Sequence, residues 1–268
     1  MNEQNKQISI IDQFIYAISK IKAYPLLVKQ SMGEVFKFVV IISILITGIS
    51  FVIPVIGYHI SLGGLQNFFQ ERLPRFTIEN GELTMDGKLD MDLFGVGIKV
   101  DPNVEKYTEK DLDENSLGEI LISKTNIIIS NVMIVNKIPF DGLNGSKITN
   151  DSFVDLIPYI YGAEVFLVFM MILSQIVVYL AGAAGYILIA FVFLPLKSEV
   201  RLTATDLFKI GVYCKTLSAL LTAINSTLGY VVGYDLWYTL SIIISWVYFF
   251  KGIMAHNEKN KMSPTQFQ

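Results

Sequence analysis

The feature that most constrains this chain is a set of long apolar runs that contain almost no charged residue. No Asp, Glu, Lys or Arg occurs in residues 38–70, 216–234 or 236–250, and only Glu164 interrupts residues 156–196. A membrane-spanning helix needs about 20 mostly apolar residues, because the hydrocarbon core of a bilayer is about 30 Å thick. A soluble core helix rarely stays apolar on every face for that long. The runs therefore predict an α-helical membrane protein with about four transmembrane helices.

The boundaries of these helices follow from where charge returns. We expect transmembrane helices over residues 38–58, 157–196, about 215–234 and about 236–255. Thr203 and Asp206 could cap the third helix, which would then enter the membrane near Lys215. The second run is long enough for one long helix or for a tight hairpin of two. Loops rich in lysine and arginine stay on the cytoplasmic side, and Lys197, Arg201, Lys209 and Lys215 follow this run. One long span is favoured, because two spans would leave these cations outside.

The charge distribution also predicts which side of the membrane each part faces. Residues 58–156 contain 16 acidic and 9 basic side chains, a balance of −7, while the rest contains 8 acidic and 12 basic, a balance of +4; together they give −3. The lysine-rich residues 1–37 place the N-terminus in the cytoplasm. The prediction is a multi-pass protein of the cytoplasmic membrane, with cytoplasmic N- and C-termini and an acidic domain outside.

Residues 1–37 form a cytoplasmic segment with an amphipathic pattern. Apolar residues recur at helical spacing at Ile11, Phe14, Ile15, Ile18 and Ile21. Such a helix with lysines before a membrane span can lie in the plane of the lipid headgroups. It can equally pack on the other cytoplasmic segments, and the pattern does not decide between the two.

Residues 61–150 have the composition of a water-exposed, β-rich domain inserted between the first two spans. Asn80-Gly81 lies between two short β-favouring segments, which is a strong hairpin signal. Residues 119–122 and 126–130 predict a second hairpin. The chain's single cysteine, Cys214, lies elsewhere, so we expect this extracytoplasmic domain to fold by packing without a disulfide.

Pro54 lies inside the first predicted span and should disturb its backbone hydrogen bonds. Proline has no N–H, so one carbonyl of the preceding turn loses its donor. The hydroxyl of Ser50, one turn earlier, is the expected replacement donor.

Four small or polar residues share one face of the third span, since Ser218, Thr222, Asn225 and Gly229 are spaced by four, three and four residues. They could line a water-filled path, or they could form interhelical hydrogen bonds, as these residue types do in membrane proteins. Packing is the simpler interpretation. The small residues 181–185 of the second span predict a similar packing face.

Glu164 and Gln175 are the other polar residues of interest within the spans. Intramembrane acids are costly and are often functional, but Glu164 lies near the predicted outer end, where water reaches it. Gln175 lies deeper, and we expect it to bond a neighbouring helix.

Signatures of catalysis and metal binding are missing. Asp111, Asp113 and Asn115 resemble the start of a calcium loop, but Ser116 replaces the required Gly and Ile122 the required Glu. The chain has no phosphate loop, G-x-S-x-G, H-E-x-x-H or C-x-x-C motif. We expect no enzymatic activity, cofactor, metal or nucleic-acid partner. Asn144 and Asn150 each begin an N-x-Ser triplet, an N-glycosylation pattern that is common by chance.

Four segments carry a family resemblance that covers nearly the whole chain: LPRFTIENGEL (73–83), IKVDP (98–102), GEILISKTNIII (118–129) and DLFKIGVY (206–213). Their order resembles a family of bacterial integral membrane proteins known as a domain of unknown function, with some likeness to Yip1-type membrane proteins. Some members are linked to maltodextrin utilisation beside sugar-importing ABC transporters. The resemblance implies an architecture and brings no catalytic residues.

The expected function is therefore that of a non-enzymatic membrane protein whose outer domain binds a partner or ligand, accessory to a transporter or signalling complex. The alternative is an oligomeric transporter or channel, since four spans per chain need a homo-oligomer to enclose a path. Polar residues around a shared cavity would favour transport, and a dry bundle would favour anchoring.

Overall fold

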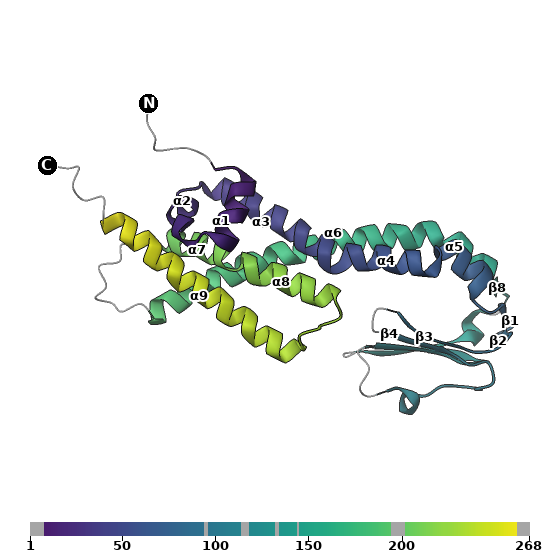
Figure 1. Ribbon diagram of the computed structural model, residues 1–268. Helices are drawn as coiled ribbons and strands as arrows, with labels where there is room; N and C mark the ends of the chain where they lie inside the picture. The colour runs from purple at the N-terminus through teal and green to yellow at the C-terminus, as the bar shows by residue number, and fades with distance from the viewer. Residues whose placement is uncertain are drawn as a thin grey trace. The chain divides into compact units, whose positions relative to one another are not determined.

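The protein divides into two compact units, each described here by itself (Figure 1). The computed structural model describes residues 8–93, 96–113, 118–131, 134–143, 145–193 and 202–261. The membrane unit comprises Met1–Gly57 and Glu164–Gln268, and the β-rich unit comprises Tyr58–Ala163. The β-rich unit is longer than the predicted domain of residues 61–150, because it includes the ends of the two flanking helices.

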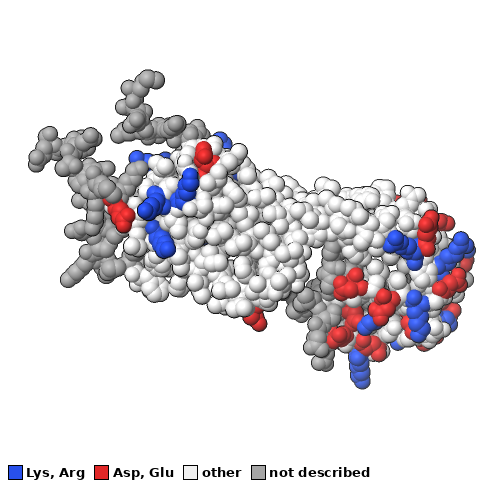
Figure 2. Space-filling view, viewed as in Figure 1, with Lys and Arg blue, Asp and Glu red and all other residues white. Residues whose placement is uncertain are grey.

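Among the described residues, four helices are long and apolar enough to cross a membrane, which confirms the prediction of a multi-pass membrane protein. They are Met32–Leu62, Asn150–Phe193, Ala204–Thr227 and Tyr234–Glu258. The first consists of α3 (Met32–Thr47), a π-helical turn (Gly48–Val52) and α4 (Ile53–Leu62), and the others are α6 (Asn150–Phe193), α7 (Ala204–Cys214) with α8 (Thr216–Thr227), and α9 (Tyr234–Lys261). On the face shown in Figure 2, charged side chains gather over the β-rich unit and are sparse over the membrane helices.

The helices begin earlier than the charge pattern indicated, because capping residues set their starts. Ser31 caps α3 by accepting a hydrogen bond from the Glu34 N–H, seven residues before the predicted start at 38. The third helix begins at Ala204 after the expected capping box of Thr203 and Asp206, but it ends at Thr227, before the predicted end near 234. Lys209 lies in this helix before the predicted membrane entry at Lys215, and its amine donates to the carbonyls of Val28 and Gln30, at 2.9 and 2.7 Å.

Residues 150–193 form one continuous helix, α6, as the single-span interpretation expects; residues 194–201 lie outside the described part of the chain. Its 44 residues would extend about 66 Å at 1.5 Å per residue, well beyond the hydrocarbon core.

The small residues of 181–185 pack closely on α7, as predicted. A methyl group added at Gly211 would meet the Ala183 carbonyl oxygen at 2.8 Å, so only a residue without a side chain fits there.

Pro54 produces a π-helical turn between α3 and α4, and the carbonyl it frees has a different partner from the one expected. In this turn each N–H bonds the carbonyl five residues back, as the Ile53 N–H bonds that of Gly48. The Ile49 carbonyl would therefore pair with residue 54. Because residue 54 is a proline and has no N–H, the Ile49 carbonyl lacks a helical donor. Thr227 of α8 places its Oγ1 2.6 Å from the Ile49 oxygen. The Ser50 hydroxyl donates to Ile46 instead, so that prediction was wrong.

The N-terminal segment packs against the spanning helices within the membrane unit. It consists of α1 (Ile10–Ser19), a 3₁₀ turn (Ile21–Ala23) and α2 (Tyr24–Val28). Gln13 and Ala17 of α1 are fully buried, and Tyr213 of α7 donates to the Gln13 side-chain oxygen at 2.8 Å. This face of α1 is therefore packed on other segments of the protein, which is one of the two positions that the sequence left open. Ile11 on the opposite face is 72% exposed.

The β-rich unit contains two small sheets. The three-stranded sheet has the order β2-β1-β8 and the five-stranded sheet the order β3-β4-β5-β6-β7, in which only β4 and β5 pair in parallel. The strands are β1 (Phe76–Glu79), β2 (Glu82–Met85), β3 (Leu89–Leu93), β4 (Val96–Val100), β5 (Gly118–Ile122), β6 (Asn126–Asn131), β7 (Val135–Pro139) and β8 (Ile148–Thr149). Short helical turns occur at α5 (Leu65–Asn67), Phe68–Arg72, Glu109–Asp111 and Phe140–Leu143.

Both predicted hairpins are present. Asn80 and Gly81 have φ values of 53° and 82°, the left-handed conformation that a tight hairpin turn between β1 and β2 requires. The second hairpin joins β5 to β6. Ile78, Leu83, Val100 and Phe140 form the buried core of the unit.

Candidate functional site

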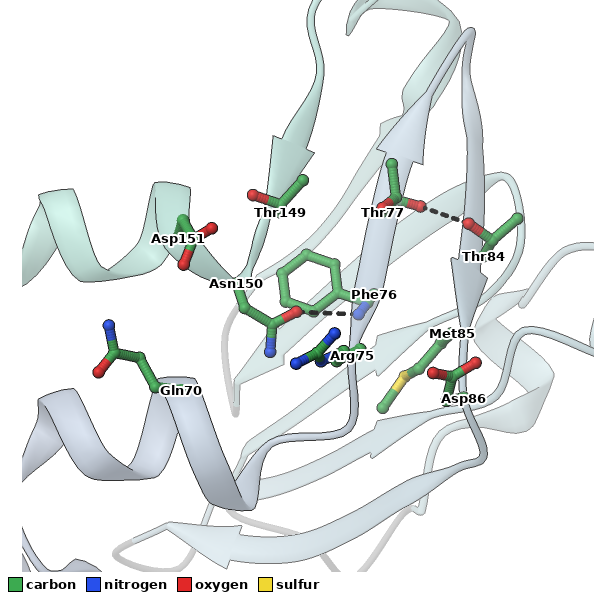
Figure 3. Close-up of a pocket in the computed structure, with 10 residues that line it drawn as sticks. All are labelled: Gln70, Arg75, Phe76, Thr77, Thr84, Met85, Asp86, Thr149, Asn150 and Asp151. Atoms are coloured by element: carbon green, nitrogen blue, oxygen red, sulfur yellow. Dashed lines mark hydrogen bonds between the residues drawn. The ribbon is translucent and has the colours of Figure 1, made fainter.

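The candidate site is a polar pocket of about 530 Å³ in the β-rich unit. It lies where the three-stranded sheet meets the first turn of α6 and the end of the helical turn Phe68–Arg72 (Figure 3). The lining residues are Gln70, Arg75, Phe76, Thr77, Thr84, Met85, Asp86, Thr149, Asn150 and Asp151. Its volume falls in the range of ligand sites in proteins, about 300–1,000 Å³.

Asn150 holds the wall of this pocket together. Its side-chain oxygen accepts the Phe76 N–H of β1 at 2.9 Å. Its side-chain nitrogen lies 3.0 Å from the Phe69 carbonyl and 3.3 Å from that of Leu73. Because the amide is committed to three backbone segments, Asn150 is a positioning residue. The predicted triplet at Asn144 lies outside the described residues.

The charged side chains of the pocket are available to a ligand. Arg75, Asp86 and Asp151 are exposed, and within the described part of the chain none of them forms an ion pair. The hydroxyl groups of Thr77 and Thr84 stand on neighbouring strands, where the Thr84 hydroxyl donates to the Thr77 carbonyl at 3.1 Å. The pocket thus offers one guanidinium, two carboxylates and several hydrogen-bonding groups beside the apolar surfaces of Phe76 and Met85.

Two ion pairs outside the pocket hold the five-stranded sheet and its connections. The hydrogen bond from Lys88 to Asp101, 2.5 Å long, lowers the pKa of the Asp101 carboxyl. The carboxylate of Glu119 bonds Lys99 at 2.9 Å and raises the pKa of that amine. The second Glu119 oxygen accepts the Asp113 N–H, also at 2.9 Å. Both ion pairs are structural.

The polar face predicted on the third span makes hydrogen bonds within the membrane unit. The hydroxyls of Ser218 and Ser245 of α9 lie 2.6 Å apart. Thr222 accepts the indole N–H of Trp237 at 2.9 Å. Asn225 bonds both the N–H and the carbonyl of Val232, at 3.0 and 2.9 Å, in the turn between α8 and α9. All three side chains thus have partners of the kind that helix packing requires.

Glu164 and Gln175 are half-buried on α6. Glu164 has an interaction partner. Gln175 forms no side-chain hydrogen bond with the residues that the structure describes, so the expected bond to a neighbouring helix is not found there.

The calcium-like sequence around Asp111 serves as a helix cap. The Asp111 carboxylate accepts the Thr108 N–H at 2.7 Å and the Thr108 hydroxyl at 2.9 Å, which lowers the pKa of Asp111. Asn115 and Ser116 lie outside the described residues. Among those described, no group of three His, Cys, Asp or Glu side chains is arranged to hold a metal ion.

Sequence reasoning did not single out any lining residue of the pocket as a ligand-binding group. The lining comes from residues 70 to 151, and no local pattern links them. A usable signal was the position of Asn150 at the start of the long helix, where the chain leaves the β-rich unit.

Comparison with known proteins identifies a family for most of the chain. Neither the curated proteins nor the solved structures contain a match to it. Residues 11–253 match the family described as "Protein of unknown function (DUF1189)". The match covers the helices of the membrane unit and the whole β-rich unit, as the resemblance in the four segments implied. The chain therefore belongs to this family of proteins of unknown function.

Proposed function

We propose that this protein is a non-enzymatic, membrane-anchored binding protein, whose β-rich unit holds a small polar ligand outside the bacterial cytoplasmic membrane. The observation that carries the proposal is the polar pocket, with Arg75, Asp86 and Asp151 unpaired among the described residues. The membrane unit would anchor the pocket beside a transporter or signalling partner.

The lining favours a neutral or zwitterionic ligand that is rich in hydrogen-bonding groups. One guanidinium stands against two carboxylates, so a multiply charged anion would be repelled by Asp86 and Asp151. The threonine hydroxyls and the Gln70 amide can bond hydroxyl groups, and Phe76 and Met85 can cover an apolar face. Maltodextrins, to which the family resemblance points, are the first compounds to test, followed by amino acids.

The orientation rests on charge. Residues 58–156 carry a balance of −7 and the remainder a balance of +4, and basic segments remain on the cytoplasmic side of bacterial membranes. The lysine-rich N-terminal segment carries this argument. Lys209 and Lys215 lie within the third spanning helix, and Lys197 and Arg201 lie outside the described residues. Both termini would then be cytoplasmic.

The test is ligand binding to the purified full-length protein in detergent. A compound that occupies the pocket should raise the unfolding temperature of the wild-type protein. Arg75→Gln should weaken the affinity at least about tenfold, because the loss of a charge-assisted hydrogen bond costs about 1.5–3 kcal/mol. Lys110→Gln, which replaces an exposed cation outside the pocket lining, is the matched control. Equal binding by Arg75→Gln and wild type would exclude the pocket.

A second candidate function is transport, and two hydroxyls buried inside the membrane unit, unpaired within the described part of the chain, are the observation that favours it. Ser43 and Thr47 lie one turn apart on α3, are 0% and 1% exposed, and their hydroxyls have no hydrogen-bond partner among the described residues. If they only pack, replacing both by Ala and Val should leave stability unchanged or increase it, because a buried unpaired hydroxyl is costly.

The double variant Ser43→Ala, Thr47→Val separates the two functions. The unfolding temperature reports packing, and complementation of a deletion strain reports function. A stable variant that fails to complement would support transport, and a stable variant that complements would support the binding protein.

A further inference from the structure

We propose that the outward face of the N-terminal segment, residues 10–29, binds the headgroups of anionic phospholipids. This headgroup-binding surface consists of Ile11 and Ile15 of α1 together with Lys20, Lys22 and Lys29. The proposal concerns the membrane unit and is independent of any ligand in the β-rich unit.

The segment is held in a fixed position on the membrane unit. The hydroxyl of Tyr213 donates to Gln13 at 2.8 Å, and that of Tyr248 on α9 donates to the Ile18 carbonyl at 2.7 Å. Tyr24, fully buried, donates to the Ala17 carbonyl at 3.2 Å and so joins α2 to α1. Because the inner face is fixed by these bonds, the side chains of the outer face present a defined surface.

The outer face combines an apolar ridge with lysines. Ile11 and Ile15, one helical turn apart, are 72% and 38% exposed. Lys20, Lys22 and Lys29 are exposed, and Figure 2 shows basic side chains gathered at the end of the membrane unit that carries α1 and α2. An apolar ridge beside lysines is typical of helices that lie at the boundary between headgroups and acyl chains.

The position in the chain puts these lysines at the membrane surface. Only residues 29–31 separate α2 from α3, the start of the first spanning helix. Exposed apolar side chains continue from Leu26 through Met32 to Phe36. Since α3 presents such side chains to the acyl region, the lysines just before it lie at headgroup depth.

The positive charge of the surface is not neutralised by the protein. In the described part of the chain, Lys20, Lys22 and Lys29 form no ion pair. The nearby carboxylates are occupied, since Asp12 accepts the Ser9 hydroxyl at 2.7 Å and Glu34 pairs with Lys37 at 2.7 Å. The Lys20 ammonium also lies over the Tyr16 ring, 5.5 Å from its centre, a contact that leaves its charge in place. Three ammonium groups without an ion-pair partner among the described residues complement a negative headgroup, and the isoleucines favour a lipid over a soluble anion.

The test uses the full-length protein in nanodiscs of equal parts phosphatidylcholine and phosphatidylglycerol. Native mass spectrometry of the released protein should show more bound phosphatidylglycerol than bound phosphatidylcholine. In the triple variant Lys20→Gln, Lys22→Gln, Lys29→Gln this enrichment, measured as the ratio of the two bound lipids, should fall at least roughly fivefold, the effect expected for loss of one or more lysines near an anionic surface. The control Lys106→Gln, Lys110→Gln, Lys147→Gln removes three exposed lysines of the β-rich unit and should keep the enrichment.

A depth measurement tests the same surface without changing its charge. In a Cys214→Ala background, a fluorophore on Ile11→Cys should be quenched by brominated lipid, and one on Asn136→Cys of β7 should not. An unchanged enrichment in the lysine variant, or no quenching at position 11, would overturn the proposal. Release of the bound lipid by millimolar inorganic phosphate would also overturn it, because the surface would then be a soluble-anion site.

Discussion

At the scale of single residues, Asn150 connects more of the β-rich unit than any signal in its sequence neighbourhood suggests. One side-chain amide bonds the Phe76 N–H and approaches the carbonyls of Phe69, Leu73 and Pro74. Removing the amide leaves these part-buried backbone groups without their partner. The free-energy cost of an unsatisfied buried group exceeds the net stabilisation that a hydrogen bond provides.

We expect Asn150→Ala to destabilise the β-rich unit by about 1–3 kcal/mol and to disorder the pocket. Hydrogen exchange of the full-length protein should become faster in β1 and at the start of α6. Asn136→Ala on the exposed strand β7 is the control and should change stability by less than about 0.5 kcal/mol. Unchanged exchange in β1 of Asn150→Ala would show that other contacts hold the pocket wall.

Asp101 makes the stability of the β-rich unit dependent on pH. Its hydrogen bond to Lys88 lowers its pKa below the ordinary value of 3.8, so the carboxylate stabilises the fold above pH 3.8. That contribution is lost as the pH falls through the lower, folded-state pKa. Lys88, whose pKa the same bond raises, stays charged throughout this acid range.

Wild type should therefore lose more thermal stability than Asp101→Asn when the pH is lowered from about 5 to about 3. The effect is small, because the Lys88 side chain is exposed and water screens the pair. A circular dichroism melt of each full-length protein at several pH values measures the difference. Parallel curves for the two proteins would mean that Asp101 does not contribute.

At the scale of elements, the turn between α3 and α4 shows how a proline is accommodated inside a spanning helix. The Ile49 carbonyl, which has no helical donor because of Pro54, is met by the Thr227 hydroxyl at 2.6 Å. The same hydroxyl lies 2.8 Å from the Ala223 carbonyl of its own helix, so its single proton is shared between two acceptors. The contact fixes α8 against α3 at this depth.

A double-mutant cycle tests this arrangement. Thr227→Val should destabilise the protein by about 1–3 kcal/mol, because it leaves the Ile49 carbonyl without a donor in a membrane helix. In a Pro54→Ala background, residue 54 regains its N–H, and the same substitution should cost clearly less. Equal costs in the two backgrounds, measured by unfolding in detergent, would show that the hydroxyl and the proline are not coupled.

At the scale of the whole molecule, the proposed function depends on the side of the membrane that each unit faces. In a Cys214→Ala background, a membrane-impermeant maleimide should label Lys106→Cys in intact cells. Lys22→Cys should be labelled only after the membrane is permeabilised. Both positions are exposed, so access to the reagent alone decides the outcome. The reverse pattern would place the β-rich unit in the cytoplasm and remove the basis for an external binding protein.

The sequence by itself determined the class of protein, the number of spanning helices and the main hairpins. Apolar runs longer than a bilayer is thick have few alternatives to a spanning helix, and Asn80-Gly81 specifies its turn through backbone conformations that few residues adopt. These signals are local, so a single sequence is sufficient to read them. The resemblance in four short segments also pointed to the right family.

Only the tertiary structure decided what the polar residues do. The pocket joins residues 70 to 151, Thr227 meets a carbonyl 178 positions away, and Lys209 donates to carbonyls 181 and 179 positions away. Hydrogen bonds between distant segments depend on how the helices and strands pack, and residue spacing carries no information about that packing. Ser50 is an example. Its spacing from Pro54 was suitable for bonding the carbonyl that the proline frees, but the Thr227 hydroxyl of another helix bonds that carbonyl instead.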